Sequence, residues 1–301
     1  MIGFALSACV SDNSPPANDS TSTETGQLTS NFPSTGDLAN GKQIFWAGGC
    51  ASCHAEPNAR GDTKLLLGGG MSLKTQFGTF NVPNISPDKV TGIGKWSNSD
   101  FSNALLKGIA PDGSHYYPSF PYTSYARMNQ KDVSDLWSYL KTLPPVTNRV
   151  KGHEIPILIK SRKALGVWKK LYFSNKKVVQ FRSPSAEIAR GQYLVEGPGH
   201  CGECHTPRNA IGGFNTKKWL AGGKDENGEQ TIPNITPHED GIGDKSFEDI
   251  LTSLEPASHD GGTPISSNMT YVRQNLAMLP LSDRKAIAAY LKAIPAIASV
   301  D

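Results

Sequence analysis

Residues 50–54 read CASCH, and residues 201–205 read CGECH. In each stretch, two cysteines are separated by two residues and a histidine follows at once, so the pattern C-x-x-C-H occurs twice. Of the five cysteines in the chain, only Cys9 lies outside these two motifs. A rare pattern that recurs half a chain length away predicts a duplicated unit within the 301 residues.

The match between the two halves extends outward from both motifs. Three further pairs of segments correspond: LANGKQIF (38–45) with IARGQYLV (188–195), VPNISPDKVTGIG (82–94) with IPNITPHEDGIG (232–243), and DVSDLWSYLKTLPPV (132–146) with DRKAIAAYLKAIPAI (283–297). Each half therefore has the same predicted order. A first helix precedes C-x-x-C-H, and a glycine-rich loop, a P-N-I loop, a helix and a final helix follow.

The final helix of each half is the clearest local prediction. Apolar residues recur at i, i+3, i+4 and i+7 in both copies, which predicts one apolar stripe on each helix. These residues are Val133, Leu136, Trp137 and Leu140 in the first copy, and Ile287, Tyr290, Leu291 and Ile294 in the second. Pro144 and Pro295 are expected to end the helices. Gly41 and Gly191 match in the first helices, where glycine costs about 1 kcal/mol relative to alanine, so a second helix should approach them closely.

The chemistry of C-x-x-C-H indicates covalent attachment of haem c. Two thiols at this spacing add to the two vinyl groups of a haem, and the adjacent imidazole binds the iron. A redox dithiol or half of a zinc site would explain one copy, but two copies at equivalent places favour haem. The expected haem-binding residues are Cys50, Cys53, His54, Cys201, Cys204 and His205.

Both halves resemble class I cytochrome c domains, in which the last helix crosses the first at a small residue. The phrases SFPYTSYARM (119–128), TGIG (91–94) and AIAAYLK (286–292) are similar to those of the di-haem and tri-haem cytochromes that accompany periplasmic alcohol and aldehyde dehydrogenases. The resemblance covers about residues 37 to 298. It implies a mainly α fold with two tandem haem domains, with Gly41 facing the helix of Tyr139 and Gly191 facing that of Tyr290.

The expected domain organisation follows from this duplication. We expect a truncated signal segment and flexible tether at residues 1–36 and a first cytochrome c domain at 37–148. A basic connector at 149–183 and a second cytochrome c domain at 184–301 should follow. Within the tether, residues 10–36 contain eleven Ser or Thr, three acids and no Lys or Arg, a composition that cannot bury a core.

The start of the chain predicts a lipid anchor. The stretch Leu6–Cys9 reads LSAC and resembles the processing box of bacterial lipoproteins, in which the cysteine is acylated after cleavage. Because no basic residue precedes it, we expect that the leader begins upstream of Met1. Together with haem attachment outside the cytoplasm, the box predicts a periplasmic lipoprotein anchored to a membrane surface through Cys9.

The resemblance also implies a methionine as the second axial ligand of each iron, supplied by the segment before the last helix. Met128 is expected in the first half, although many relatives have a methionine where Phe120 stands. In the second half, the repeat register favours Met278, whereas the resemblance favours Met269, and we choose Met269; Met278 would then be a packing residue. His115 and His259 offer the less favoured alternative of bis-histidine ligation.

The connector is strongly basic. Residues 151–182 contain nine Lys or Arg and one acid, Glu154, while the rest of the chain has 21 basic and 26 acidic residues. ALGVWKKLYF (164–173) predicts a short helix. The connector either packs across both halves with its lysines in water or docks on an acidic partner or an anionic bilayer. The run has no recognised nucleic-acid-binding module, so nucleic acid is not an expected partner.

These observations favour a periplasmic di-haem cytochrome c. We expect it to transfer electrons from a dehydrogenase towards a terminal oxidase or another cytochrome, as a non-catalytic subunit. The alternative is a di-haem enzyme of the peroxidase or thiosulfate-oxidising type. Such an enzyme needs an exchangeable iron position or an unusual axial ligand, and the sequence has no cysteine to spare for the latter.

Overall fold

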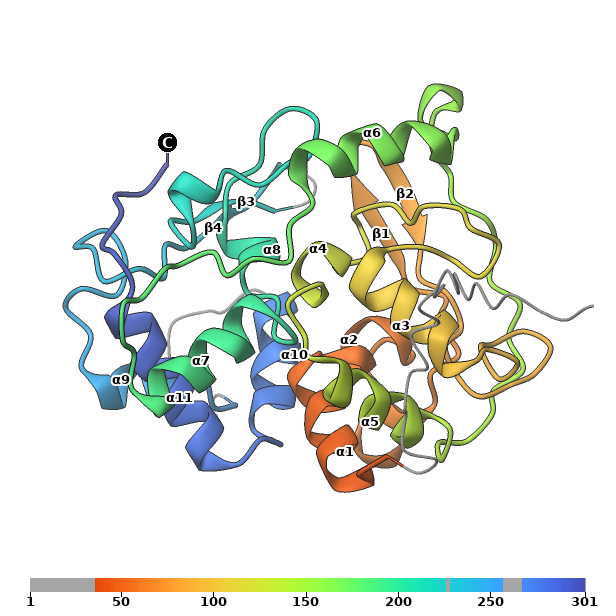
Figure 1. Cartoon of the computed structure of the whole chain (residues 1–301), viewed down its shortest axis with the longest axis horizontal. Coiled ribbons are helices and arrows are strands. Elements are labelled where there is room, and N and C mark those ends of the chain that lie inside the picture. The colour runs from red at the N-terminus through yellow and green to blue at the C-terminus, as the bar shows by residue number, and fades with distance from the viewer. Residues whose placement is uncertain (1–35, 226–227, 257–266, 301) are drawn as a thin grey trace, which may run out of the picture. The chain divides into compact units, whose positions relative to one another are not determined.

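The computed structural model describes residues 36–225, 228–256 and 267–300, which are mainly helical (Figure 1). The helices are α1 (Leu38–Ala47), α2 (Cys50–His54), α3 (Asn98–Lys107), α4 (Tyr122–Tyr125), α5 (Gln130–Leu140), α6 (Arg162–Tyr172), α7 (Ala186–Glu196), α8 (Gly202–His205), α9 (Phe247–Ser253), α10 (Ser267–Leu276) and α11 (Leu281–Ala293). Short 3₁₀ turns cover residues 61–65, 157–159 and 216–218. Among the described helices, none combines the length and the apolar character needed to cross a bilayer.

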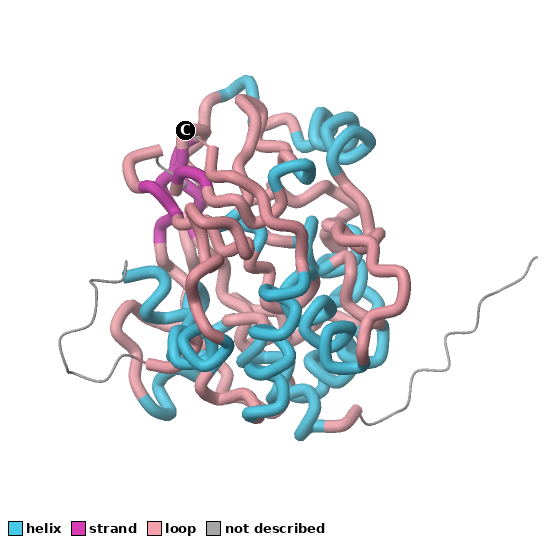
Figure 2. The backbone as a smooth tube through the Cα atoms, turned by 90° about the vertical axis from the view of Figure 1, so that its left-hand side faces the viewer, coloured by secondary structure: helices cyan, strands magenta, loops and turns pink. Residues whose placement is uncertain are grey.

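Two short antiparallel hairpins replace what the sequence predicted as loops (Figure 2). In the first, β1 (Ser72–Thr75) pairs with β2 (Gly78–Asn81); in the second, β3 (Gly223–Lys224) pairs with β4 (Thr231–Ile232). The first hairpin turns at residues 76–77, and Gly78, which follows the turn, has a φ of 113° that glycine adopts without strain. The prediction missed these hairpins because each strand is only two to four residues long.

The first and last helices of each half pack against each other, α1 on α5 and α7 on α11 (Figure 1). A Cβ atom on Gly41 would lie 2.2 Å from the carbonyl oxygen of Asp135 and 2.8 Å from Cβ of Tyr139. A Cβ atom on Gly191 would lie 1.9 Å from the carbonyl oxygen of Ala286 and 2.8 Å from Cβ of Tyr290. Glycine therefore allows each pair of helices to touch, as the sequence predicted.

The apolar stripes predicted for the final helices form part of the hydrophobic core. In α5 the stripe from Val133 to Leu140 is buried, and in α11 the residues Ile287, Tyr290 and Leu291 are buried. Both helices end before the proline that follows them in sequence. The periodicity of the apolar residues therefore predicted the two helices and their buried faces correctly.

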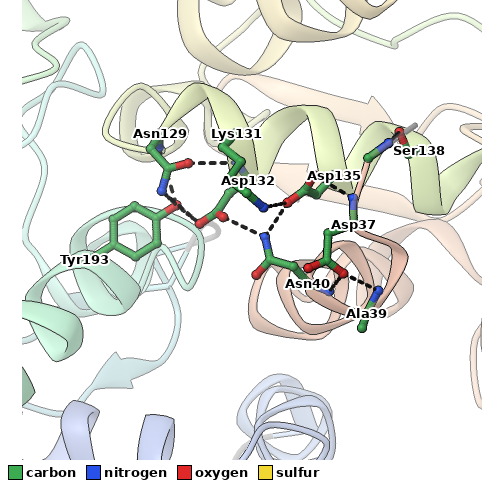
Figure 3. A network of polar contacts seen from close by, with 10 residues as sticks. Asp37, Ala39, Asn40, Asn129, Lys131, Asp132, Asp135, Ser138 and Tyr193 are labelled. Carbon is green, nitrogen blue, oxygen red and sulfur yellow. Dashed lines mark hydrogen bonds and ion pairs between the residues drawn. The ribbon is translucent and has the colours of Figure 1, made fainter. Parts of the chain in front are cut away.

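The start of α1 is fixed to α5 by a network of carboxylates (Figure 3). Asp37 caps the helix, since its Oδ1 accepts hydrogen bonds from the backbone N–H groups of Ala39 and Asn40, both at 3.0 Å. The buried Asp135 of α5 accepts from the Asp37 N–H at 2.9 Å, from Asn40 Nδ2 at 2.7 Å and from Lys131 Nζ at 2.5 Å. The crossing of α1 and α5 is thus held by polar contacts beside Gly41.

The same network joins the two halves of the chain. Tyr193 of α7 donates its hydroxyl hydrogen to Asp132 Oδ2 of α5 at 2.5 Å, and Asp132 Oδ1 accepts from Asn40 Nδ2 at 2.7 Å (Figure 3). Both halves therefore share one buried carboxylate, which joins α1, α5 and α7.

Replacing Asp135 by Asn should destabilise the protein most above the ordinary pKa of an aspartate, about 4, and progressively less in acid. Burial alone would raise the pKa of Asp135, but the bonds from Lys131, Asn40 and the Asp37 N–H outweigh it and lower the pKa. A lowered folded-state pKa contributes stability above the ordinary value, and this stability is lost as pH falls through the lowered value. Urea unfolding should show a cost of about 1.5–3 kcal/mol at neutral pH, which shrinks in acid. An unchanged difference at low pH would contradict the assignment.

The connector forms α6 and contacts both halves of the chain. Trp168 Nε1 donates to the carbonyl oxygen of Ile211 at 2.8 Å, and Lys169 Nζ lies 3.3 Å from His115 Nδ1. The predicted helix is therefore confirmed, and it contacts both halves of the chain.

Candidate functional site

The first C-x-x-C-H motif forms α2, directly after α1. Gly49 separates the two helices with φ 59°, in the left-handed region, so the chain turns sharply there without strain. The motif then winds as one short helix from Cys50 to His54, which brings both cysteines and the histidine onto a single turn. In the second half, α8 carries Cys204 and His205 in the same way.

Both motif histidines are oriented by the repeated P-N-I loop. Nδ1 of His54 lies 2.8 Å from the carbonyl oxygen of Pro83, and Nδ1 of His205 lies 2.8 Å from that of Pro233. Because a carbonyl oxygen only accepts hydrogen bonds, Nδ1 carries the hydrogen in each ring and Nε2 keeps the lone pair. Burial lowers the pKa of His54 to about 4 and lowers that of His205. Each ring is therefore a neutral, oriented imidazole whose Nε2 is left with the lone pair that a metal ligand needs.

The glycine-rich loops follow the histidines in the same way in both halves. The N–H of Gly69 donates to the carbonyl of His54 at 2.8 Å, and the N–H of Gly222 donates to that of His205 at 2.8 Å. Both glycines have positive φ, 70° and 85°. The two loops therefore hold the two histidine backbones with equivalent bonds.

The asparagines of the repeated phrase tie it to the chain after each final helix. Asn84 donates through Nδ2 to the carbonyl of Val146 at 2.7 Å and accepts through Oδ1 from the Ser86 N–H at 2.9 Å. Asn234 makes the same bonds with the carbonyl of Ile297 and the Thr236 N–H. These bonds shape the loop in the same way in both halves. The role of the proline carbonyls was missed, because every residue has a carbonyl and no side chain signals its use.

The first cysteine of each motif is kept as a neutral thiol. Burial raises the pKa of Cys50 to about 12 and that of Cys201 to about 11. A structural zinc site needs a second pair of ligands, and neither it nor a redox dithiol needs a histidine fixed directly after the second cysteine. Two cysteines beside an oriented imidazole fit thioether attachment of a haem instead.

Each C-x-x-C-H motif makes hydrogen bonds with the opposite half of the chain. Glu203, between the cysteines of the second motif, accepts hydrogen bonds from Thr123 at 2.8 Å and Ser124 at 2.7 Å, both on α4. Ser52, between the cysteines of the first motif, accepts from Asn275 Nδ2 of α10 at 2.6 Å. Each motif is therefore held by the segment that precedes the final helix of the opposite half.

The methionines before the final helices differ in their surroundings. The Met128 N–H donates to the carbonyl of Tyr125, and the Met278 N–H donates to that of Asn275, so the two occupy equivalent turns. Met128 is only 6% exposed and belongs to the core, whereas Met278 is 52% exposed. The sequence predicts a packing role for Met278, but about half of its surface is exposed and it lies outside the core cluster. Met269 lies on α10 and is partly buried.

The remaining sequence candidates are His115, Phe120, Cys9 and His259. His115 lies beside Lys169, and a Cβ atom on Gly166 of α6 would lie 2.9 Å from its Nε2. Phe120 packs among the rings of Tyr116, Tyr122 and Tyr125. Cys9 and His259 are not among the described residues.

The helix crossing, the C-x-x-C-H turn and the oriented histidine define a c-type cytochrome, a protein whose haem c is bound covalently. A family model described as cytochrome c matches residues 38–144. A diheme cytochrome c-type protein of Cereibacter sphaeroides is 49% identical over 263 residues, which cover 87% of this chain and 88% of that protein. The chain belongs to this family of diheme cytochromes c, which are electron-transfer proteins.

Other relatives are subunits of dehydrogenases. The fructose dehydrogenase cytochrome subunit of Gluconobacter japonicus is 33% identical over 86% of this chain, and the cytochrome c subunit of alcohol dehydrogenase (quinone) of Gluconobacter oxydans is 32% identical over 86%. The chain spans 53% and 55% of the length of these two proteins.

Proposed function

We propose that the chain is a periplasmic di-haem cytochrome c that accepts electrons from a dehydrogenase and passes them to a terminal oxidase or another cytochrome. The printed names of the dehydrogenase subunits among its relatives support the kind of donor. The LSAC stretch supports a lipid anchor on Cys9 and hence a place at the periplasmic membrane surface.

The proposal assigns one haem to each half, at residues 37–148 and 184–301. Cys50 and Cys53 would hold the first haem and Cys201 and Cys204 the second, each through two thioether bonds. His54 and His205 would be the proximal iron ligands. The observation that carries the proposal is the matching pair of bonds from Nδ1 to a proline carbonyl, because they present Nε2 in both halves alike.

A bound haem supplies reversible one-electron exchange, and the chain fixes where it occurs. The hydrogen bonds of Glu203 and Ser52 hold each motif against the opposite half. His200, directly before the second motif, lies with Nε2 3.3 Å from the carbonyl oxygen of Gly48, directly before the turn into the first. These contacts support electron passage between the two halves within one chain.

For the second axial ligands we propose Met128 and Met269. The burial of Met128 supports a role inside the fold, and the exposure of Met278 favours Met269 in the second half. A thioether is a soft ligand that favours reduced iron and raises the reduction potential.

Replacing Met269 by Ala should remove the sulfur-to-iron charge-transfer band of one of the two haems, about half of its total intensity if both haems have sulfur ligands. Met278→Ala is the matched control, since its side chain is exposed and should leave the band intact. Near-infrared absorbance of the oxidised protein measures both. If Met278→Ala removes the band and Met269→Ala does not, the assignment is wrong.

The same preparation distinguishes an electron carrier from an enzyme. A carrier with both irons closed should be low-spin at both haems and resistant to cyanide. A stable high-spin iron that binds cyanide readily would instead support direct oxidation or reduction of a small substrate. If, in addition, Met128→Ala had no effect on the spectrum, the open position on the iron would lie next to Phe120.

A further inference from the structure

Helix α6 lies at the edge of the fold with one face fixed inward (Figure 1). Besides the bond from Trp168, the hydroxyl of Tyr172 accepts from Asn209 Nδ2 at 3.0 Å, and its ring covers Gly213. On the first half, Lys169 Nζ lies 5.3 Å from the ring centre of Tyr122. Contacts with both halves therefore determine which side of α6 is turned outward.

The outward side carries apolar residues that nothing in the described part of the chain covers. Val167 and Leu171, one helical turn apart, are 63% and 68% exposed. Ile211, whose carbonyl binds Trp168, is 54% exposed. Single exposed apolar side chains are ordinary on protein surfaces, but Val167 and Leu171 lie one turn apart on the same side of one helix. We call the exposed residues Lys163, Ala164, Val167, Lys170 and Leu171 the α6 face.

The charges of α6 itself have one sign, and the acid beside it is Asp112, which interacts with Arg162 at the start of the helix. The helix reads RKALGVWKKLY and contains no acid. The nearest acid in the connector, Glu154, lies 3.8 Å from Lys151 and forms an ion pair with it. Exposed lysines extend the basic area on both sides of the helix, at positions 160, 176 and 177. Since the rest of the chain is net acidic, a negatively charged surface would attract this side and repel the others.

We propose that the α6 face docks on the surface of an anionic phospholipid bilayer, with Val167 and Leu171 inserted between headgroups and the lysines on lipid phosphates. Eleven helical residues extend about 16 Å and a helix is about 10 Å wide, so the face covers on the order of 160 Å², far less than the roughly 800 Å² that each partner buries in a stable protein complex. A bilayer needs no complementary groove, and apolar side chains flanked by lysines are the features that hold helices at its interface. The contact would orient both haem motifs relative to the membrane.

The test uses the full-length haem-loaded protein with Cys9→Ser, so that no lipid on Cys9 contributes. Vesicles of three parts phosphatidylcholine to one part phosphatidylglycerol should sediment the protein, measured by haem absorbance in the pellet. Vesicles of phosphatidylcholine alone should sediment much less. Each lysine near an anionic surface strengthens binding about fivefold, so Lys163→Gln with Lys170→Gln should weaken binding at least tenfold. Raising salt from about 0.05 M to about 0.5 M should have a similar effect.

The apolar part of the α6 face is tested separately. Val167→Ser with Leu171→Ser should weaken vesicle binding at least fivefold without changing the helix content. Lys89→Gln with Val90→Ser is the matched control, because these two residues are also exposed but lie in a loop far along the chain from α6. Their replacement should leave vesicle binding unchanged.

Two results would overturn the proposal. One is the absence of binding to anionic vesicles. If, in that case, the lysine variants also slow reduction of the haems by a dehydrogenase, the α6 face docks on an acidic protein instead. The other is equal binding by the α6 variants and the control. Both results would leave the haem spectra, and hence the proposed electron-transfer function, unaffected.

Discussion

Replacing Glu196 by Ala should lower the free energy of unfolding by about 4 kcal/mol, because it leaves several buried donors without an acceptor. Glu196 ends α7 and is only 1% exposed. Its carboxylate accepts from the N–H groups of Val178 at 2.7 Å and Val179 at 3.0 Å, from Gln192 Nε2 at 2.9 Å and from the Tyr290 hydroxyl at 2.8 Å. It joins the connector, α7 and α11 at one point.

The loss should also be visible locally. With Val178 and Val179 released, trypsin should cleave after Lys176 and Lys177 faster in the folded variant than in the parent protein. Glu187→Ala is the control, since Glu187 lies on the same helix with an exposed side chain, and it should cost no more than about 0.5 kcal/mol. Equal unfolding midpoints for the two variants would show that the buried carboxylate does not stabilise the fold.

Replacing Gly191 by Ala should cost about 2 kcal/mol or more. The added carbon would lie 1.9 Å from the carbonyl oxygen of Ala286, so α7 and α11 would have to separate. Overpacking of this kind costs about 3 kcal/mol, from which the better helix propensity of alanine subtracts about 1 kcal/mol.

Denaturant unfolding followed by circular dichroism measures this cost. Gly41→Ala should behave in the same way, because its added carbon would lie 2.2 Å from the carbonyl oxygen of Asp135. Gly152→Ala is the control, since no atom lies within 4 Å of the added carbon. If Gly191→Ala is as stable as Gly152→Ala, the helices are not held in contact at this residue.

The two halves differ at the residue that follows LANGKQIF (38–45) in the first half and IARGQYLV (188–195) in the second. Glu196 in the second half corresponds to Trp46 in the first, which is also buried. Trp46 Nε1 has no hydrogen-bond partner among the described residues, whereas Glu196 has four. The repeat indicates the common framework, and this substitution shows that only the second copy uses the position to anchor the connector.

The sequence alone determined the features that depend on residue type and spacing. The spacing in C-x-x-C-H indicated haem attachment, and the recurrence of apolar residues predicted α5 and α11. Gly41 and Gly191 indicated a close helix approach, because only a missing side chain allows two backbones to touch. These are local properties, so one sequence was sufficient to predict them.

Only the tertiary structure decided which groups meet across long stretches of chain. The carbonyls of Pro83 and Pro233 orient the motif histidines, although a backbone carbonyl has no signature in the sequence. Met128 and Met278 occupy equivalent turns, yet one is buried and the other exposed. Burial depends on which segments fold over a residue, and that arrangement is set by the packing of the whole chain.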